Sequence, residues 1–271
     1  MVPLTALDAD HAPYCAPGPG ICAGEMPSPF ARDAADASPD PPAFTDRAEA
    51  GELLGAAVRR AIEEFKFDDH ERPVVFAIPR GGVAVPAGVA RQLNASLDVI
   101  VVRKIGHPQA PEFGLGAIAE GGEPVFDSAA LDESGLDVAD LAAVVARERA
   151  ELARRIGVYR GAPGLPPGRA PGLRAADRES AGLLIVVDDG LATGVTARAA
   201  LRAVRARGGP CARTVLAVPV AAANSLASVK AEAGAVVTVV TTRRLRSVGE
   251  WYVDFGQLTD ADVLTLLAAG P

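Results

Sequence analysis

Two adjacent carboxylates end an apolar run in the second half of the chain. In the stretch LLIVVDDGLATGVTARAAL, residues 183–201, five apolar residues precede Asp188 and Asp189, and a small loop with Thr193 and Thr196 follows them. An apolar run of this length is typical of a buried strand, and open parallel sheets bind ligands beyond the carboxyl ends of their strands. Asp188 and Asp189 are therefore candidate ligand-binding residues.

The loop after the two acids has the composition of a phosphate site. Gly190 and Gly194 let the backbone approach a ligand closely, and the hydroxyls of Thr193 and Thr196 add donors. Val195 is expected to begin a helix, whose free N–H groups and positive dipole end favour a phosphate. Because sugar hydroxyls donate to carboxylates, an acidic pair beside a phosphate loop predicts a sugar phosphate ligand.

Three familiar motifs and a purely structural role fit this stretch less well. A P-loop needs Gly-Lys-Ser/Thr after a strand and a Rossmann fingerprint needs G-x-G-x-x-G, and neither pattern follows a predicted strand. A phosphoacceptor aspartate site uses paired acids but gives no reason for the T-G-x-T that comes next. The acids could also merely end a strand and cap a helix, but two acids at a buried edge are costly without a partner.

Composition limits the remaining function classes. The 271 residues, 49% hydrophobic and 23% charged, are enough for one large soluble domain or two small ones. With a net charge of -7 and no long basic run, we expect no nucleic-acid surface. No apolar run approaches the roughly 18 residues of a membrane span, and the first residues lack signal-peptide features, so a cytoplasmic location is expected. The scattered Cys15, Cys22 and Cys211 are expected to be unpaired thiols.

Pro and Gly divide the chain into a tail and a core. Residues 1–43 hold nine of the 22 prolines and no apolar period, which predicts a disordered or loosely packed extension. Residues 44–271 are expected to form the functional domain. Within it, the Pro/Gly-rich residues 161–181 are expected to be a surface connection.

Strand and helix patterns alternate along the domain. We expect strands at 73–78, 97–102, 183–187, 213–220 and 235–242, and helices at 46–65 (capped by Thr45 or Asp46), 83–93, 137–160, 195–207, 224–233 and from Asp260. Residues 103–120 predict a long loop with a short strand near 116–120. This alternation predicts an α/β fold, a doubly wound parallel sheet with helices on both faces.

The stretch LLIVVDDGLATGVT resembles the phosphoribosyl-diphosphate signature of the type I phosphoribosyltransferases: an apolar strand, two acids, two variable residues, then Ala/Asp-Thr-Gly-x-Thr. The resemblance covers about residues 45–258 and implies that fold, with a small hood region contributed by about 243–258. It implies that Asp188 and Asp189 bind the ribose 2′ and 3′ hydroxyls. It also implies a 5′-phosphate loop made of Ala192, Thr193, Gly194, Val195 and Thr196.

The same resemblance implies a pyrophosphate site. The segment IPRGG, residues 78–82, stands where the family binds pyrophosphate, with Arg80 as a fixed cation and Gly81 and Gly82 as exposed backbone donors. In VVRKIG, Arg103 and Lys104 stand at the end of the next predicted strand, and Lys104 resembles a second pyrophosphate ligand. PRGG could instead be a simple strand-to-helix turn, and one of the two cations could be a solvated surface charge.

Residues 105–118 take the place of the family's flexible catalytic loop, which closes over the substrate and excludes water. His107 and Glu112 lie in it and could transfer protons, although we expect His107 to be an ordinary exposed histidine. In the hood, Trp251 and Tyr252 are candidates for stacking on a planar acceptor. The competing interpretation is that these aromatics pack the terminal helix on the sheet.

The implied activity is transfer of a 5-phosphoribosyl group from phosphoribosyl diphosphate to an unidentified planar nitrogenous acceptor, in nucleotide metabolism, with release of pyrophosphate. Mg²⁺ would assist, held by Asp188 and Asp189 directly or through water, while Arg80 and Lys104 stabilise the leaving group. The family also implies a homodimer. The motifs PRGGV, VVRKIG, PEFGLGAIAEGG, VDDGLATG and VGEWYVDFGQ resemble bacterial members whose acceptor is poorly defined.

One departure bears on the acceptor. The 6-oxopurine enzymes place a third acid where this chain has Ala192, so hypoxanthine or guanine is a less favoured acceptor than adenine-like, pyrimidine or non-nucleobase compounds. Two other functions stay open. The chain could be a non-catalytic sensor of phosphoribosyl diphosphate or a nucleotide, or a hydrolase or phosphorylase of a phosphoribosyl compound. The enzyme is favoured over the sensor because both cationic segments, PRGG and RK, are present.

Overall fold

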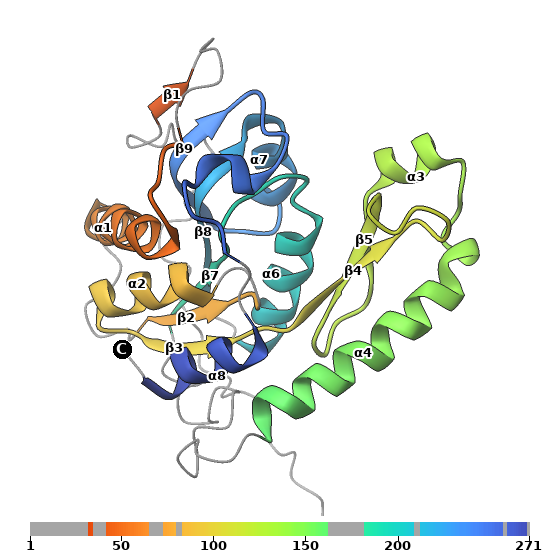
Figure 1. Cartoon of the computed structure of the whole chain (residues 1–271), viewed down its shortest axis with the longest axis horizontal. Helices are drawn as coiled ribbons and strands as arrows, with labels where there is room; N and C mark the ends of the chain where they lie inside the picture. Colours follow the sequence, from red (N-terminus) through yellow and green to blue (C-terminus); the bar gives the residue numbers. More distant parts are fainter. Residues whose placement is uncertain are drawn as a thin grey trace, which may run out of the picture.

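A parallel β-sheet forms the centre of the fold (Figure 1). The computed structural model describes residues 32–34, 42–64, 73–79, 83–161, 182–208, 212–256 and 259–269. The strand order in the sheet is β1-β9-β8-β7-β2-β3. These strands are β1 (Arg32–Ala34), β2 (Val74–Ala77), β3 (Ser96–Val99), β7 (Leu183–Val187), β8 (Arg213–Ala222) and β9 (Ala235–Thr242). Because the order is not the chain order, the sheet is doubly wound, as predicted.

The position of β7 in the middle of the sheet explains why its sequence is apolar at every position. Leu184 and Val186 belong to one hydrophobic cluster and Leu183, Ile185 and Val187 to another, on the opposite face of the sheet. Successive side chains of a strand point to opposite faces, so a strand covered on both sides must be apolar throughout. All five residues are buried.

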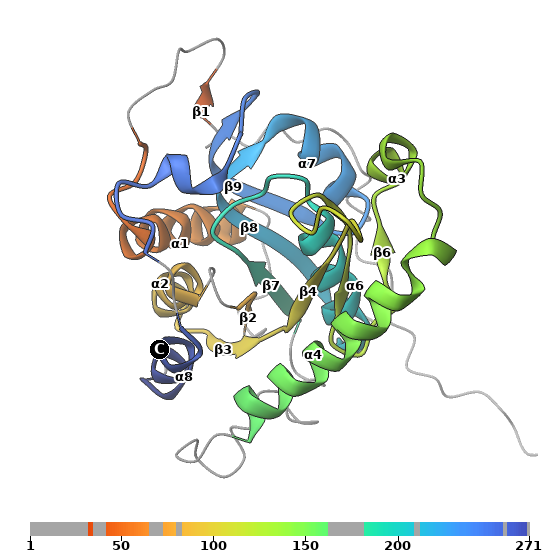
Figure 2. The same cartoon turned by 45° about the vertical axis from the view of Figure 1, so that its right-hand side comes forward.

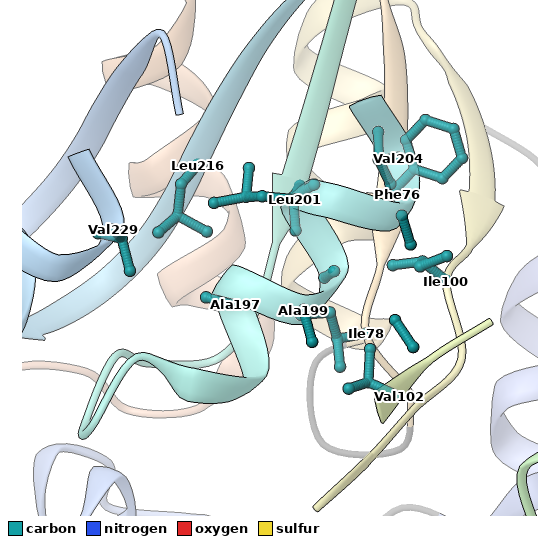
Figure 3. Packing of buried hydrophobic residues seen from close by; sticks show 14 of the residues in the cluster. Phe76, Ile78, Ile100, Val102, Ala197, Ala199, Leu201, Val204, Leu216 and Val229 are labelled. Carbon is teal, nitrogen blue, oxygen red and sulfur yellow. The ribbon is translucent and has the colours of Figure 1, made fainter. Parts of the chain in front are cut away.

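Helices cover both faces of the sheet (Figure 2). Helices α1 (Arg47–Glu64) and α2 (Ala84–Leu93) pack on one face, and α6 (Val195–Arg207) packs on the other. Figure 3 shows Leu201 and Val204 of α6 against Phe76 and Ile100. A shorter helix, α7 (Ala223–Lys230), follows β8.

The predicted cap of the first helix is confirmed. Asp46 Oδ1 accepts hydrogen bonds from the backbone N–H groups of Ala48 at 2.8 Å and Glu49 at 2.9 Å. Capping of this kind satisfies donors that the first turn of a helix leaves without partners. It fixes where α1 begins, and therefore where Arg47, its first residue, lies.

An antiparallel sheet replaces the long loop that the sequence predicted at 103–120. It contains β4 (Val102–Gly106), β5 (Gly114–Ala119) and β6 (Val125–Phe126), in the order β4-β5-β6. The short strand expected near 116–120 is confirmed as part of β5. The loop prediction was wrong because the Gly and Pro residues are concentrated around the turn of a hairpin, where His107 N–H donates to Phe113 O at 2.8 Å.

The predicted strand 97–102 is also divided. β3 ends at Val99, and Val102 already begins β4 in the second sheet. Val101 lies between them, and its carbonyl accepts from Glu120 N–H at 2.9 Å, which closes the base of the hairpin. Arg103 and Lys104 therefore lie inside a strand and not at the end of one.

The remaining elements agree more closely with the sequence. The helix expected at 137–160 is α4 (Ala142–Arg160), preceded by the 3₁₀ turn η2 (Ala139–Leu141), and the terminal helix is α8 (Asp260–Ala269). Helix α3 (Ser128–Ser134) was not predicted. None of the described helices combines the length and apolar character that crossing a membrane requires.

Part of the predicted organisation falls beyond the described ranges. Residues 1–31, 35–41 and 162–181, and the three cysteines, lie outside them. Within the proposed extension, Arg32–Ala34 forms β1, which pairs in parallel with β9.

Candidate functional site

Asp188 and Asp189 lie at the carboxyl end of β7, between β8 and β2. Asp188 N–H donates to Ala217 O of β8 at 3.4 Å, and Ile78 N–H, just after β2, donates to Val187 O at 3.2 Å. Ile78 thus lies beside Val187, the residue that precedes the two acids. Arg80, Gly81 and Gly82 come next in the sequence but lie outside the described residues, so their roles stay predictions.

A buried arginine that sequence reasoning did not single out holds Asp189. Arg47 Nε and Nη2 donate to Asp189 Oδ2 at 3.2 and 3.1 Å, and Nη1 donates to Gly256 O at 2.6 Å. The guanidinium carbon also lies 3.6 Å from the centroid of the Phe255 ring. The two side chains are only 9% and 14% exposed, so this ion pair is shielded from solvent.

The hood segment reaches the same aspartate through Tyr252. Its hydroxyl donates to the backbone carbonyl of Asp189 at 2.6 Å, and its ring packs against Phe44 and Phe255 with centroids 5.3 and 5.0 Å away. Tyr252 is buried, and Trp251 is half-buried against the same apolar cluster. In this arrangement Tyr252 positions Asp189, and its ring faces are covered by aromatic neighbours.

Burial raises the pKa of both carboxyl groups of the acid pair. Burial, and then the neighbouring charge of Asp189, raise the pKa of Asp188 well above its ordinary value. Burial also raises the pKa of Asp189, although Arg47 and Lys104 oppose this shift. Adjacent acids with raised pKa values are stabilised by a cation or by hydroxyl donors, and such groups cluster at functional sites.

The neighbouring cations Arg103 and Lys104 point to opposite sides of β4, as successive residues of a strand must. Lys104 is exposed, and its positive charge opposes the upward pKa shift of both aspartates. Arg103 instead pairs with Glu148 of α4, through Nε at 3.0 Å and Nη2 at 2.8 Å. The structure therefore brings Lys104, and not Arg103, into the electrostatic field of the acid pair.

The loop after the acids is anchored to β8. Leu191 N–H donates to Val220 O at 2.8 Å, and Ala222 N–H donates to Leu191 O at 2.8 Å. Ser225 Oγ donates to Ala192 O. These contacts fix the loop and leave Ala192 and Thr193 exposed at its tip.

Helix α6 begins at this loop without a side-chain cap. Gly194 is its N-cap residue, with φ 85° and no side-chain hydrogen bond, and Val195 and Thr196 form the first turn. The first N–H groups of a helix have no intrahelical acceptors and carry partial positive charge. The loop predicted to bind phosphate can therefore present backbone donors to an anion.

His107 has a structural role in the β4–β5 hairpin. Its Nδ1 accepts from the backbone N–H groups of Gln109 at 3.1 Å and Ala110 at 3.2 Å, which organises the turn. Glu112 is exposed in the same turn. No hydrogen bond or ion pair connects either side chain with the acid pair in the described part of the chain.

The donor set at the acid pair fits a hard divalent cation. Carboxylate oxygens are the ligands that Mg²⁺ prefers, and it retains waters or takes further ligands from phosphates. Across the described ranges, no group of three or more His, Cys, Asp or Glu side chains could hold a metal. A cation at Asp188 would therefore complete its coordination with water and substrate oxygens.

Taken together, the fold and the site define an α/β protein of the doubly wound class, with a candidate ligand site at the carboxyl edge of its parallel sheet. The chain belongs to the phosphoribosyl transferase domain family, whose model matches residues 45–242. The match begins just before Arg47 and ends at the last residue of β9, so it includes the two acids and the loop predicted to bind phosphate.

Named relatives agree with this assignment. A Mycobacterium tuberculosis H37Rv protein, "Putative phosphoribosyl transferase Rv0571c", is 35% identical over 226 residues, which are 83% of this chain and 46% of the relative. Its counterpart MT0597 in strain CDC 1551 has the same identity and coverage. The chain thus spans about half the length of the curated relatives it matches. Among solved structures, TT1426 from Thermus thermophilus is 39% identical with a TM-score of 0.59, over 83% of this chain and 98% of that one.

Proposed function

We propose that the protein transfers the 5-phosphoribosyl group of phosphoribosyl diphosphate to a planar nitrogenous acceptor and releases pyrophosphate. The observation that carries this proposal is the acid pair at the carboxyl end of β7, followed directly by the uncapped start of α6 at Gly194. A ribose 5-phosphate site needs carboxylates that accept hydrogen bonds from the ribose hydroxyls. It also needs donors for the phosphate, which the N–H groups at a helix start can supply. Membership of the phosphoribosyl transferase domain family supports the assignment.

In this reaction the acceptor nitrogen forms a bond to C1 of the ribose while the bond from C1 to the pyrophosphate oxygen breaks. The sugar gains positive charge and the leaving group gains negative charge. Asp188 and Asp189 orient the sugar through its hydroxyls, and the loop ending at Gly194 holds the 5′-phosphate. Lys104 and Arg80 stabilise the departing pyrophosphate electrostatically.

Bound Mg²⁺ would supply further charge stabilisation to the leaving group. Asp188 is the residue best suited to hold it, because Oδ2 of Asp189 is already engaged by Arg47. The raised pKa of Asp188 supports the same choice, since a nearby divalent charge would offset the cost of ionising a buried carboxyl.

Calorimetric titration of phosphoribosyl diphosphate with Mg²⁺ tests the proposal. Wild type should bind in a metal-dependent way, and the Asp188→Asn, Asp189→Asn double variant should lose binding by two powers of ten or about 3 kcal/mol. The matched control is Asp132→Asn, Glu133→Gln, which neutralises an adjacent pair of exposed acids on α3. No binding to wild type, or equal binding to the double variant, would refute the proposed site.

Assay of pyrophosphate separates transfer from the other reactions. Release that requires a planar base indicates transfer. Release with water alone indicates a hydrolase, and binding without release under either condition indicates a sensor.

A further inference from the structure

Three exposed arginines lie in the segment that joins β9 to the 3₁₀ turn η3 (Val248–Trp251). They are Arg243, Arg244 and Arg246, within five residues of the carboxyl end of β9. Ligands of an open parallel sheet bind at this end. The proposed function gives these arginines no role.

Contacts at both ends of this segment place it beside the acid pair. At its start, Thr242 is in register with Ala222 of β8, whose N–H donates to Leu191 O of the phosphate loop at 2.8 Å. At its end, a Cβ added to Gly190 would lie 2.6 Å from Val248 Cγ1. The segment can be followed above the sheet in Figure 2, from the tip of β9 to the turn over α1.

These guanidinium groups differ from most others in the protein. Most of the other described arginines pair with glutamates, as in Arg149–Glu123, Arg154–Glu151 and Arg202–Glu232, although Arg198 and Arg205 of α6 make no such pair. In the described ranges, by contrast, none of the three hood guanidinium groups makes an ion pair or a hydrogen bond. Arg244 takes part only through its backbone N–H, which donates to Thr242 Oγ1 at 3.2 Å.

The cluster is a local excess of positive charge on an acidic protein. The whole chain carries a net charge of -7, so an anion would be repelled from most of its surface. Of the acids that follow in the hood, Glu250 and Asp254 are exposed, and they leave the three arginines in excess. The guanidinium fork is suited to carboxylate and phosphate groups, which it can bind with two parallel hydrogen bonds.

We infer that Arg243, Arg244 and Arg246 bind a negatively charged group, a carboxylate or phosphate, on the acceptor. This inference rests on the proposed function and deepens it by naming the class of acceptor. In that proposal the loop ending at Gly194 binds the 5′-phosphate of the donor and Lys104 stabilises its pyrophosphate. The three arginines are therefore available to bind the second substrate, the acceptor.

Paired probes that differ by one negative charge test the inference. Nicotinate and nicotinamide, and orotate and uracil, are planar pairs in which one member carries a carboxylate. Their affinities would be measured by ligand-observed NMR with Mg²⁺ and pyrophosphate present. A charge-assisted contact predicts that the anionic member binds about tenfold tighter or more in wild type. The Arg243→Gln, Arg244→Gln, Arg246→Gln variant should lose this preference.

The control variant removes the same number of charges elsewhere. Arg147→Gln, Arg149→Gln, Arg154→Gln lies on α4 and changes side chains that are 65%, 48% and 55% exposed. It should keep the preference for anions. Equal binding of charged and neutral probes to wild type, or a preference that survives in the hood variant, would overturn the inference.

Binding of Mg²⁺ and phosphoribosyl diphosphate to the same proteins separates the two proposals. If wild type does not bind this donor, the proposed function fails. If wild type and the hood variant bind it equally but neither favours anionic probes, only the acceptor inference fails. If the hood variant loses donor binding, the arginines serve the donor, and the acceptor inference is again wrong.

Discussion

Arg47 and Asp189 are 142 positions apart in the sequence and form a buried ion pair, in which two guanidinium nitrogens share one carboxylate oxygen. The arginine is also bound to Gly256 O and covered by Phe255. It thus connects the start of α1, the end of β7 and the hood. The second oxygen of Asp189 keeps its capacity to accept hydrogen bonds from a ligand.

Removing this arginine should weaken both the fold and the site. Arg47→Ala leaves a buried carboxylate without its partner, which typically costs about 3–5 kcal/mol of unfolding free energy. Arg47→Lys keeps the charge but loses the paired donors and the planar contact with Phe255, so it should recover only part of the loss. Urea unfolding and titration with Mg²⁺ and phosphoribosyl diphosphate measure the two effects.

Arg59→Ala is the control on the same helix, because Arg59 is exposed and contacts Gln92 instead of the site. It should change stability by less than about 1 kcal/mol and leave binding unchanged. Because Arg47→Lys is expected to remain folded, its donor affinity tests whether the guanidinium group of Arg47 positions Asp189. If it binds the donor as tightly as wild type does, the fork contact is not needed to orient Asp189.

Tyr252→Phe should produce a smaller and more local effect. The variant keeps the ring packing with Phe44 and Phe255 but removes the hydrogen bond to Asp189 O, which is worth about 1 kcal/mol. We expect a loss of that size in unfolding free energy, together with weaker donor binding, because the backbone of Asp189 is less firmly held.

Tyr159→Phe provides a matched comparison. Tyr159 hydroxyl donates to Asp260 Oδ1 at 2.7 Å, in a contact between α4 and α8. This variant should lose stability without any change in donor affinity. Equal donor affinities of wild type, Tyr252→Phe and Tyr159→Phe would show that Tyr252 stabilises the fold without contributing to donor binding.

Much of this site could be predicted from local sequence. The order apolar strand, two acids and small loop is contiguous, and it is constrained by strand periodicity and helix starts. The strand β7, the position of Asp188 and Asp189 directly after it, and the start of α6 were therefore predicted correctly. Arg47 could not be predicted in the same way. Its partner is distant in sequence, and an arginine next to a helix cap gives no sign of being buried.

The hairpin was missed for a related reason. Antiparallel pairing of β4 with β5 brings Lys104 opposite Ala117, and neither strand has a long apolar run. Gly and Pro near the turn favoured a loop over the whole segment. The fold of the hairpin distinguishes the two cations, because the charge of Lys104 acts on the two aspartates whereas Arg103 pairs with Glu148.

Gly194→Ala should damage the phosphate loop specifically. Gly194 has φ 85°, where a residue with a Cβ is strained by about 1–2 kcal/mol, and the added Cβ would lie 3.1 Å from Val229 Cγ1. We expect a stability loss of that size and weaker binding of ribose 5-phosphate, measured by calorimetry. Gly157→Ala, inside α4 with open space around it, should instead be neutral or slightly stabilising. Unchanged binding by Gly194→Ala would contradict the assignment of this loop to the phosphate.

The ligand-free protein should become less stable as pH rises through the titration of its buried acids. The ordinary pKa of an aspartate is 3.8, and burial raises the folded-state pKa of Asp188 above it. Between these two values the folded state binds more protons than the unfolded chain, so the free energy of unfolding falls with rising pH. Asp98, whose pKa burial raises to about 6, adds a contribution of the same sign.

Asp188→Asn should therefore stabilise the ligand-free protein while it weakens donor binding. At pH 7 the variant avoids ionising a buried group beside Asp189, so we expect it to be more stable than wild type and to have a flatter pH dependence. Urea unfolding between pH 5 and pH 8 measures both quantities. Asp98→Asn is the control: it should flatten the dependence near pH 6 and leave donor affinity intact. An Asp188→Asn protein less stable than wild type at pH 7 would mean that the ionised carboxylate stabilises the fold, against the direction of its pKa shift.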